Sequence, residues 1–203
     1  MFKVTKSGNS KLGRMYSLNL PAVATCDRNA PCCKIDPETG KAPCYALKGR
    51  YIFPNVTKCY WENLRVWKTN PNQATIDILS QIHPDKEGLC RIHASGDIPD
   101  YQYLFMLVTI AINRPNVRFM LFTKRYNYVN YHYRIYKWFP PNLTIIFSEW
   151  KDFPMWNPYQ FPVAKVDITN STCPNQKDKT VTCAKCRKCW NLKEGQEVIF
   201  KIH

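Results

Sequence analysis

Residues 15–46 read MYSLNLPAVATCDRNAPCCKIDPETGKAPCYA, a short apolar stretch followed by a loop that holds four of the ten cysteines. The alternation in Met15–Leu20 and the proline after it predict a strand that ends at Pro21. The loop then presents Cys26, Cys32, Cys33 and Cys44. Four thiols directly after a first strand indicate a metal site at the end of that strand, and the rest of the chain is interpreted around it.

Length and composition favour a single intracellular metal-binding domain. The 203 residues suit one domain and can bury a core without cross-links. The first residues hold no apolar signal segment, and no apolar run reaches the roughly 18 residues that span a bilayer, so we expect a cytoplasmic protein with no membrane contact. Clustered cysteines in that setting favour metal binding over disulfides.

The charge balance is strongly basic, with 29 Lys and Arg against 15 Asp and Glu and a formal net charge of +14. Such a balance favours nucleic acid or another anionic partner, with salt-sensitive association. Two alternatives stay open: a generally basic protein with no such partner, or a charge that is offset by negatively charged thiolate-bound clusters.

Strand-like and helix-like stretches alternate after the first strand, which predicts parallel βαβ units. We expect helices over residues 55–69, 73–82, 101–113 and 126–139, the third of them capped by Asp100. We expect further strands over residues 89–94, 117–123, 143–148, 163–169 and 197–202. The predicted fold is α/β, with a mostly parallel curved sheet over residues 1–170 and a cysteine-rich metal-binding segment over residues 171–203, packed on the same domain.

Polar side chains alternate with apolar ones in two of these strands, Arg91-x-His93-x-Ser95 and Lys165-x-Asp167-x-Thr169. A sheet buried on both faces would be apolar on both, so this pattern predicts a curved sheet or partial barrel with a site inside. Sites in such folds gather at the carboxyl ends of the strands. The residues expected there are Ser95, Gly96, Asp97, Lys124, Arg125 and Glu149.

The C-terminal cysteines have the spacing of an iron–sulfur site. Two residues separate Cys183 from Cys186 and Cys186 from Cys189. The remote Cys173 precedes a proline, as the remote ligand of bacterial ferredoxin-type sites does. Zinc is the alternative, although its four-cysteine sites usually form two pairs. We expect Cys173, Cys183, Cys186 and Cys189 to bind a [4Fe–4S] cluster.

The N-terminal loop offers one cysteine more than an open cluster needs. Adjacent cysteines rarely bind the same ion, so we take Cys26, Cys32 and Cys44 as ligands and Cys33 as spare, although Cys32 and Cys33 could exchange roles. Three thiolates on a [4Fe–4S] cluster leave one iron for a substrate or cofactor. A four-cysteine zinc loop is the alternative. Cys59 and Cys90 are expected to be ordinary small core residues.

Several segments resemble the phage "gene product 88" family, and the resemblance covers nearly the whole chain. They are GNSKLG (Gly8–Gly13), YSLNLPA (Tyr16–Ala22), the loop Thr25–Tyr51 with its TC, APC and CYALKGRY motifs, SGD (Ser95–Asp97), FTKR (Phe122–Arg125) and the final TC and CxxCxxCW motifs. The resemblance implies a phage or other mobile-element protein and no particular activity.

The layout is also similar, at a distance, to the radical S-adenosylmethionine (SAM) superfamily. That resemblance implies a partial barrel in which Cys26, Cys32 and Cys44 bind the cluster beside Tyr45, and Ser95-Gly96-Asp97 replaces the turn that binds the methionine amine. The loop departs from the superfamily pattern, since C-x5-C-x11-C replaces C-x3-C-x2-C and Asp97 stands for a glutamate. The cluster can therefore be present with SAM binding altered or absent, and a plain strand-to-helix turn is the alternative for Ser95–Asp97.

Two functions follow from these observations. The first is an iron–sulfur protein with two [4Fe–4S] sites, a radical-SAM-like redox enzyme of unknown substrate that needs a reductant. The second is a non-enzymatic nucleic-acid-binding protein of a mobile element, stabilised by zinc or iron–sulfur. His93 and Asp97 are candidate catalytic residues, with a hydrogen-bonded core histidine as the alternative for His93. Lys124 and Arg125 are candidates for holding an anionic group, or else form a solvated basic turn.

Overall fold

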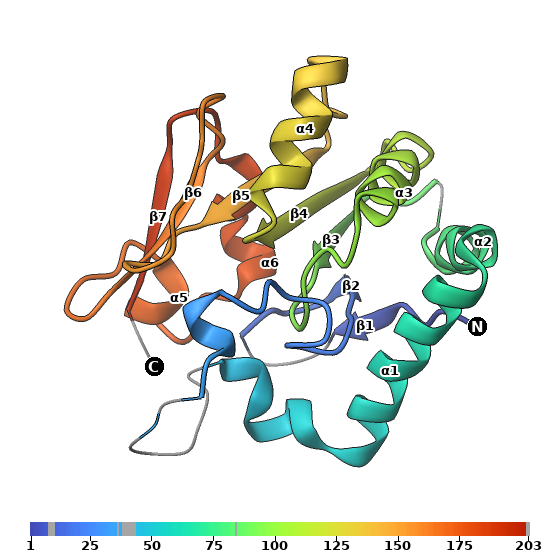
Figure 1. Ribbon diagram of the computed structural model, residues 1–203, viewed down its shortest axis with the longest axis horizontal. Coiled ribbons are helices and arrows are strands. Elements are labelled where there is room, and N and C mark those ends of the chain that lie inside the picture. Colours follow the sequence, from blue (N-terminus) through green and yellow to red (C-terminus); the bar gives the residue numbers. More distant parts are fainter. Residues whose placement is uncertain (8–10, 36, 38–43, 84, 202–203) are drawn as a thin grey trace.

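The computed structural model describes residues 1–7, 11–35, 37, 44–83 and 85–201, which form a mixed α/β fold (Figure 1). Within these residues one sheet has the order β1-β2-β3-β4-β5-β6-β7, and every neighbouring pair is parallel except β1 with β2. The strands are β1 (Thr5–Ser7), β2 (Met15–Leu18), β3 (Gly88–Ile92), β4 (Val117–Thr123), β5 (Leu143–Ser148), β6 (Val163–Asp167) and β7 (Glu197–Lys201).

Four longer helices connect the first strands, and short helices fill the two cysteine segments. The α-helices are α1 (Pro54–Thr69), α2 (Pro71–Gln81), α3 (Tyr101–Ile112), α4 (Tyr126–Tyr136), α5 (Pro174–Lys177) and α6 (Cys183–Cys186). The 3-10 helices are η1 (Pro31–Cys33), η2 (Tyr45–Leu47), η3 (Gly49–Ile52) and η4 (Lys188–Asn191). Every helix in the described part of the chain is too short or too polar to cross a membrane.

The predicted α/β class and mostly parallel sheet are confirmed, and each predicted strand overlaps an observed one. Asp100 caps α3 as expected, because its side chain accepts a hydrogen bond from the Tyr103 backbone N–H. The short polar β1 carries no apolar alternation that would predict it. The sheet is open, with β1 and β7 at its edges, so the predicted resemblance to a barrel is not confirmed.

One face of the sheet packs against α1 to α4. Because alternate strand residues point to the same face, a single set of apolar side chains meets the apolar stripes of the helices. From the strands these are Leu18, Ile92, Phe119, Leu121, Ile145 and Phe147, and from the helices Trp67, Ile78, Leu104, Leu107 and Val129. This layer holds the larger of the two buried clusters.

The opposite face is covered by the C-terminal cysteine segment. Its own cluster contains Leu12, Met15, Leu89, Met120, Ile146, Ala164, Trp190 and Val198. Trp190 is buried and donates from Nε1 to the backbone oxygen of Cys90 at 3.3 Å. Its backbone oxygen accepts from Arg118 Nη2 at 2.8 Å and from Thr144 Oγ1 at 3.0 Å. η4 is therefore fastened across β3, β4 and β5.

The polar alternation in β3 and β6 does not form one polar interior face. Arg91 pairs in register with Met120, which places it on the face covered by the cysteine segment. Lys165 lies two residues after Val163, which pairs with Phe147 of the helix-covered face. There Lys165 forms an exposed ion pair with Glu197 at 2.6 Å. The prediction from alternation was wrong for β6, since this strand lies near the sheet edge, where polar residues meet solvent.

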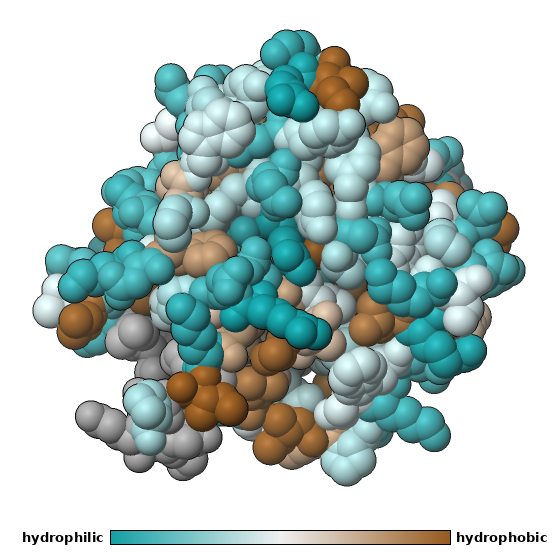
Figure 2. Space-filling view, in the orientation of Figure 1, coloured by the Kyte–Doolittle hydropathy of each residue, from teal (hydrophilic) through white to brown (hydrophobic). Residues whose placement is uncertain are grey.

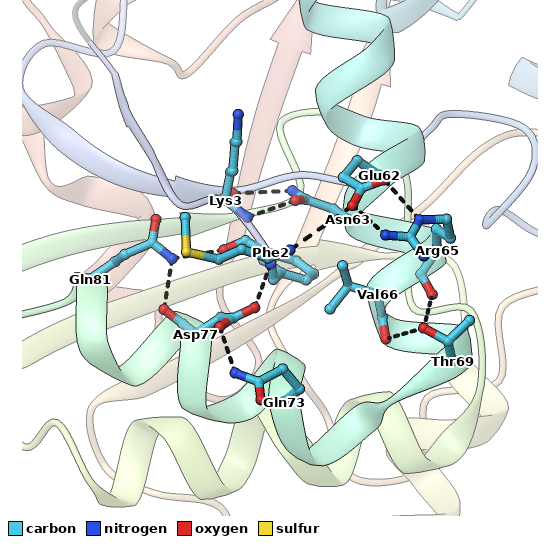
Figure 3. A network of polar contacts seen from close by, with 11 residues as sticks. Phe2, Lys3, Glu62, Asn63, Arg65, Val66, Thr69, Gln73, Asp77 and Gln81 are labelled. Atoms are coloured by element: carbon cyan, nitrogen blue, oxygen red, sulfur yellow. Dashed lines mark hydrogen bonds and ion pairs between the residues drawn. The ribbon is translucent and has the colours of Figure 1, made fainter.

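Hydrogen bonds from side-chain amides and a carboxylate hold the N-terminal segment against α1 and α2 (Figure 3). Asp77 accepts from the Phe2 backbone N–H at 2.6 Å. Asn63 accepts from the Lys3 N–H at 2.7 Å and donates to the backbone oxygens of Lys3 at 3.1 Å and Asn19 at 3.0 Å. Because Asn19 directly follows β2, Asn63 also fixes the start of the cysteine loop.

Candidate functional site

The N-terminal cysteine loop leaves the carboxyl end of β2 through a tight turn. Thr25 Oγ1 donates to the backbone oxygen of Pro21 at 2.9 Å and accepts from the backbone N–H of Asp97 at 3.1 Å. Asn19 Oδ1 accepts from the N–H groups of Ala94 and Ser95 at 2.9 and 3.2 Å. The loop is thus attached at its base to the turn after β3, the turn at which Ser95, Gly96 and Asp97 were predicted to form a site.

Gly96 permits that attachment. Its φ is +84°, and a Cβ there would lie 2.7 Å from Thr25 Oγ1 and 2.8 Å from the Leu20 oxygen. A residue with a side chain would be strained by the left-handed conformation and would also collide with the loop. The glycine therefore lets the turn after β3 and the cysteine loop meet in backbone contact.

Asp97 is buried at the same edge, and its carboxylate is already occupied. Oδ1 accepts from Thr123 Oγ1 at 2.6 Å and from the Ile98 N–H at 2.8 Å, and Oδ2 accepts from the Lys124 N–H at 2.8 Å. Burial raises the pKa of the Asp97 carboxyl, and these hydrogen bonds oppose that shift. The contacts make Asp97 a link between the ends of β3 and β4.

Lys124 and Arg125 serve the loop in different ways. Arg125 Nη2 donates to the backbone oxygens of Cys26 at 2.9 Å and Thr25 at 3.3 Å, and Nη1 lies 3.5 Å from Asp27 Oδ2. Lys124 Nζ donates to Ser148 Oγ at 3.2 Å, and its charge acts on the Cys32 thiol. Arg125 is therefore an anchor of Cys26, and Lys124 is the cation beside the thiols.

Cys33, the cysteine expected to be spare, is the neighbour that most strongly affects the pKa values of the Cys26 and Cys32 thiols. Cys33 Sγ is within hydrogen-bonding reach of both Cys26 and Cys32, and Cys44 acts on the same two groups by its charge. Mainly through the Cys33 hydrogen bond, and with help from Lys124, the pKa of Cys32 falls to about 6. The pKa of Cys26 is lowered by the same neighbour, whereas burial raises that of Cys44.

The cysteine loop and the segment that joins it to α1 present apolar side chains to solvent. In Figure 2, apolar residues gather along the lower edge of the view, where Figure 1 draws the segment before α1. The exposed residues are Ile35, Tyr45, Leu47, Ile52 and Phe53. Exposed apolar patches are typical of binding surfaces, and this one borders the thiol group.

The C-terminal cysteines are held by backbone contacts with residues 11–13. The N–H groups of Cys183 and Ala184 donate to the oxygens of Lys11 and Leu12, each at 2.9 Å. A Cβ at Gly13, whose φ is +74°, would lie 3.0 Å from Ala184 Cβ. Burial raises the pKa of Cys183, and it raises that of Cys189 to about 12.

Arg91 lies between the two cysteine segments, although no motif in the sequence marks it as a site residue. Its Nη2 donates to the Tyr45 hydroxyl at 3.3 Å, and its guanidinium carbon lies 5.8 Å from the centre of the Phe122 ring. Burial lowers its pKa, but the neighbouring Tyr45 hydroxyl and the Cys183 thiol help to raise it overall. Only pairing in the sheet places this arginine next to both segments.

His93 is directed away from the thiols. It has a positive φ of 60°, which interrupts the alternation of β3 and turns the ring toward α3. There Nε2 lies 3.2 Å from the Tyr103 hydroxyl and the two rings stack, with centres 5.5 Å apart. Burial lowers the pKa of His93 to about 3. The structure therefore agrees with the alternative of a hydrogen-bonded core histidine.

The fit of the cysteines to a metal rests on their chemistry. Among the described residues no three or more Cys, His, Asp or Glu side chains form a group that could hold a metal ion. Both cysteine segments nevertheless have a neighbouring cation, since the charge of Lys124 acts on Cys32 and the charges of Lys11 and Arg91 act on Cys183. Neighbouring cations favour thiolates, which are the ligands of iron–sulfur clusters and of structural zinc.

Comparison with known proteins assigns the family. The family model for gene product 88 matches residues 3–192. The chain belongs to the gene product 88 family. The matched range includes both cysteine groups, so both lie within the gene product 88 region. No curated protein sequence and no solved structure matches the chain, and the resemblance to the radical SAM superfamily has no support from these comparisons.

Proposed function

We propose that this gene product 88 protein is an iron–sulfur protein with two [4Fe–4S] sites, one bound by Cys26, Cys32 and Cys44 and the other by the four C-terminal cysteines. The observation that carries the proposal is the fixed position of the N-terminal thiols at the carboxyl end of a parallel sheet. Arg125 and Thr25 hold the start of their loop there. Ligands of open α/β sheets bind at this edge.

The two sites differ in the number of thiolates they offer. With three thiolates, the N-terminal site would leave one iron open, and such a cluster supplies one-electron reduction to a group bound there. With four, the C-terminal site would carry or store electrons. The chain itself contributes Lys124 and Arg91, whose charges offset the negative charge of thiolate-bound clusters.

The experiment is purification without oxygen, followed by absorbance near 400 nm and a count of iron, sulfide and zinc. Each double variant, C26A/C44A and C183A/C186A, should lose about half of the iron, because each removes two ligands of one four-iron cluster. Cys59→Ser on α1 is the matched control and should keep all of it. A colourless protein with stoichiometric zinc would overturn the proposal.

The finer proposal is a radical-SAM-like redox enzyme, with the open sheet as part of a barrel. Its support is the loop of three cysteines after the first parallel strand, with Ser95-Gly96-Asp97 packed against the base of that loop. Incubation of the iron-loaded protein with dithionite and SAM should release 5′-deoxyadenosine. Intact SAM would reject this chemistry and leave the iron–sulfur proposal standing.

A second candidate is a metal-stabilised nucleic-acid-binding protein, favoured by a groove of about 500 Å³ beside α4. Aromatic side chains line it with a cation among them, including Tyr133, Trp138, Tyr159 and Lys137. The Lys137 ammonium lies 5.4 Å from the centre of the Tyr159 ring. Aromatic rings beside cations are typical of surfaces that stack bases and contact phosphates.

The test is titration of a labelled single-stranded oligonucleotide at several salt concentrations. Binding should weaken steeply as the salt concentration rises, because a chain with a net charge of +14 would gain much of its affinity from contacts with phosphates. Trp138→Ala should weaken it further, while Trp61→Ala, an exposed tryptophan on α1, should not. No binding at low salt would reject this candidate.

A further inference from the structure

A second, smaller pocket lies at the carboxyl edge of the sheet, between the start of α4 and the segment after β5. It has a volume of about 240 Å³, and its walls include Asp27, Lys124, Asn127, Asn130, Phe153 and Trp156. Asp27 follows Cys26 directly, and Lys124 is the cation that acts on Cys32. The pocket is therefore adjacent to the N-terminal thiols.

Asn130 lines this pocket, and one atom of its side-chain amide has no hydrogen-bond partner among the described residues. The residue is only 2% exposed, and its Nδ2 donates to the Trp156 backbone oxygen at 2.7 Å. That bond fixes the orientation of the amide, because only the nitrogen can donate. Its Oδ1 is buried and has no hydrogen-bond partner among the described residues. A ligand that offers an N–H group would give this oxygen a partner.

The other walls suit a flat ring. Trp156 is 66% exposed, and the Phe153 ring packs at 5.7 Å on Tyr126 in the pocket floor. Asn127 lies one helical turn before Asn130, on the same side of α4, so a second amide is available for an edge of that ring. Stacking on an aromatic ring with amide contacts to the edge is how proteins hold a single unpaired base.

We propose that this pocket takes one nucleobase of a single-stranded polynucleotide, with its face on Trp156 and an N–H edge toward Asn130. The volume suits a base rather than a whole nucleotide, and the net charge of +14 favours a polynucleotide over a free base. The inference does not depend on the proposed iron–sulfur sites. Binding itself requires no metal.

The experiment uses a 12-nucleotide single-stranded DNA with one 2-aminopurine, whose fluorescence is quenched on stacking. The protein should quench it, and Trp156→Ala and Asn130→Leu should each weaken binding about tenfold, the size expected for one stacked base or one buried hydrogen bond. Trp61→Ala is the matched control and should bind like the unmodified chain. Thermal unfolding establishes that each variant is folded, and the exposed Trp156 supplies a variant that leaves the core intact.

Further measurements distinguish a polynucleotide from a free nucleotide in the pocket, and the base-binding proposal from the iron–sulfur proposal. The free monophosphate of 2-aminopurine should bind far more weakly than the oligonucleotide, and equal affinity would overturn the polynucleotide assignment. Oligonucleotide binding without quenching, unchanged in Trp156→Ala, would show phosphate contact alone and overturn the pocket. The metal content of the same protein is also measured. If a zinc-bound chain quenches the 2-aminopurine fluorescence, only the iron–sulfur proposal is rejected. If an iron-loaded chain does not quench it, only the base-binding pocket is rejected.

Discussion

At the scale of the residue, Gly96 and Gly49 form a natural comparison. Both have positive φ, +84° and +57°, but a Cβ at Gly96 would collide with Thr25 and Leu20, whereas nothing lies within 4 Å of one at Gly49. Gly49→Ala should lose about 1 kcal/mol of unfolding free energy from backbone strain alone. Gly96→Ala should lose about 1–3 kcal/mol more, because the loop must move.

Denaturant unfolding of both variants measures this difference. The same variants also distinguish the effect of backbone strain from the effect of moving the cysteine loop, since only Gly96→Ala displaces the base of that loop. Equal losses in the two variants would show that the turn after β3 does not hold the loop.

His93 predicts an acid sensitivity. Its pKa of about 3 in the folded chain lies below the ordinary 6.5, so between these values the unfolded chain binds the proton and the folded chain does not. Stability is therefore fully present above pH 6.5 and falls as the pH drops toward 3. At pH 5 the unfolding free energy should be about 2 kcal/mol lower than at pH 8, because pH 5 lies roughly 1.5 units below the ordinary histidine pKa of 6.5.

The measurement compares unfolding at pH 5 and pH 8 under reducing conditions. His93→Gln should lose the His93 share of the difference, because glutamine does not titrate. His83→Gln, at an exposed position before β3, should keep the full difference. The same pH dependence in His93→Gln as in the unmodified chain would contradict a buried neutral His93.

At the scale of the element, Asn63 ties three segments together. It bonds to both backbone groups of Lys3 and to the Asn19 oxygen, and it is 1% exposed (Figure 3). Asn63→Ala leaves buried groups without partners, so unfolding free energy should fall by about 2–3 kcal/mol. Glu62→Ala, next in the chain, removes only surface ion pairs with Arg65 and, at 3.9 Å, with the Met1 amine, so it should change the unfolding free energy little. Similar unfolding free energies for the two variants would mean that the contacts of Asn63 with the N-terminal segment are not part of the cooperative fold.

At the scale of the whole molecule, Trp190 attaches the cysteine segment to the second face of the sheet. It is 3% exposed and contacts β3, β4 and β5 through its hydrogen bonds. Trp190→Ala should cost about 3–5 kcal/mol, the usual loss for a buried tryptophan. The exposed Trp61→Ala should cost little.

The metal content of the same variant tests the link between docking and the C-terminal site. Trp190→Ala should lose the iron of the C-terminal cysteines first, because residues 183–189 then lack a fixed support. Full iron content in an otherwise destabilised Trp190→Ala would show that the cysteine segment binds its metal without docking on the sheet.

The sequence determined most of the fold, because apolar periodicity and helix caps are local. Asp100 before α3 and the apolar run in residues 117–123 are sufficient to predict those elements. The spacing of the cysteines likewise indicated two sets. β1 and the open sheet did not follow from sequence, since both depend on pairing between distant strands.

What the sequence by itself determined is the α/β class, the two cysteine groups and the basic charge. Only the tertiary structure decided which polar residues share a place. Parallel pairing put Arg91 beside both cysteine segments, positive φ turned His93 into the helix layer, and Asn130 met the pocket next to Lys124. The physical reason is that periodicity fixes a side chain's face on its own element, whereas its neighbours are set by register and packing between elements.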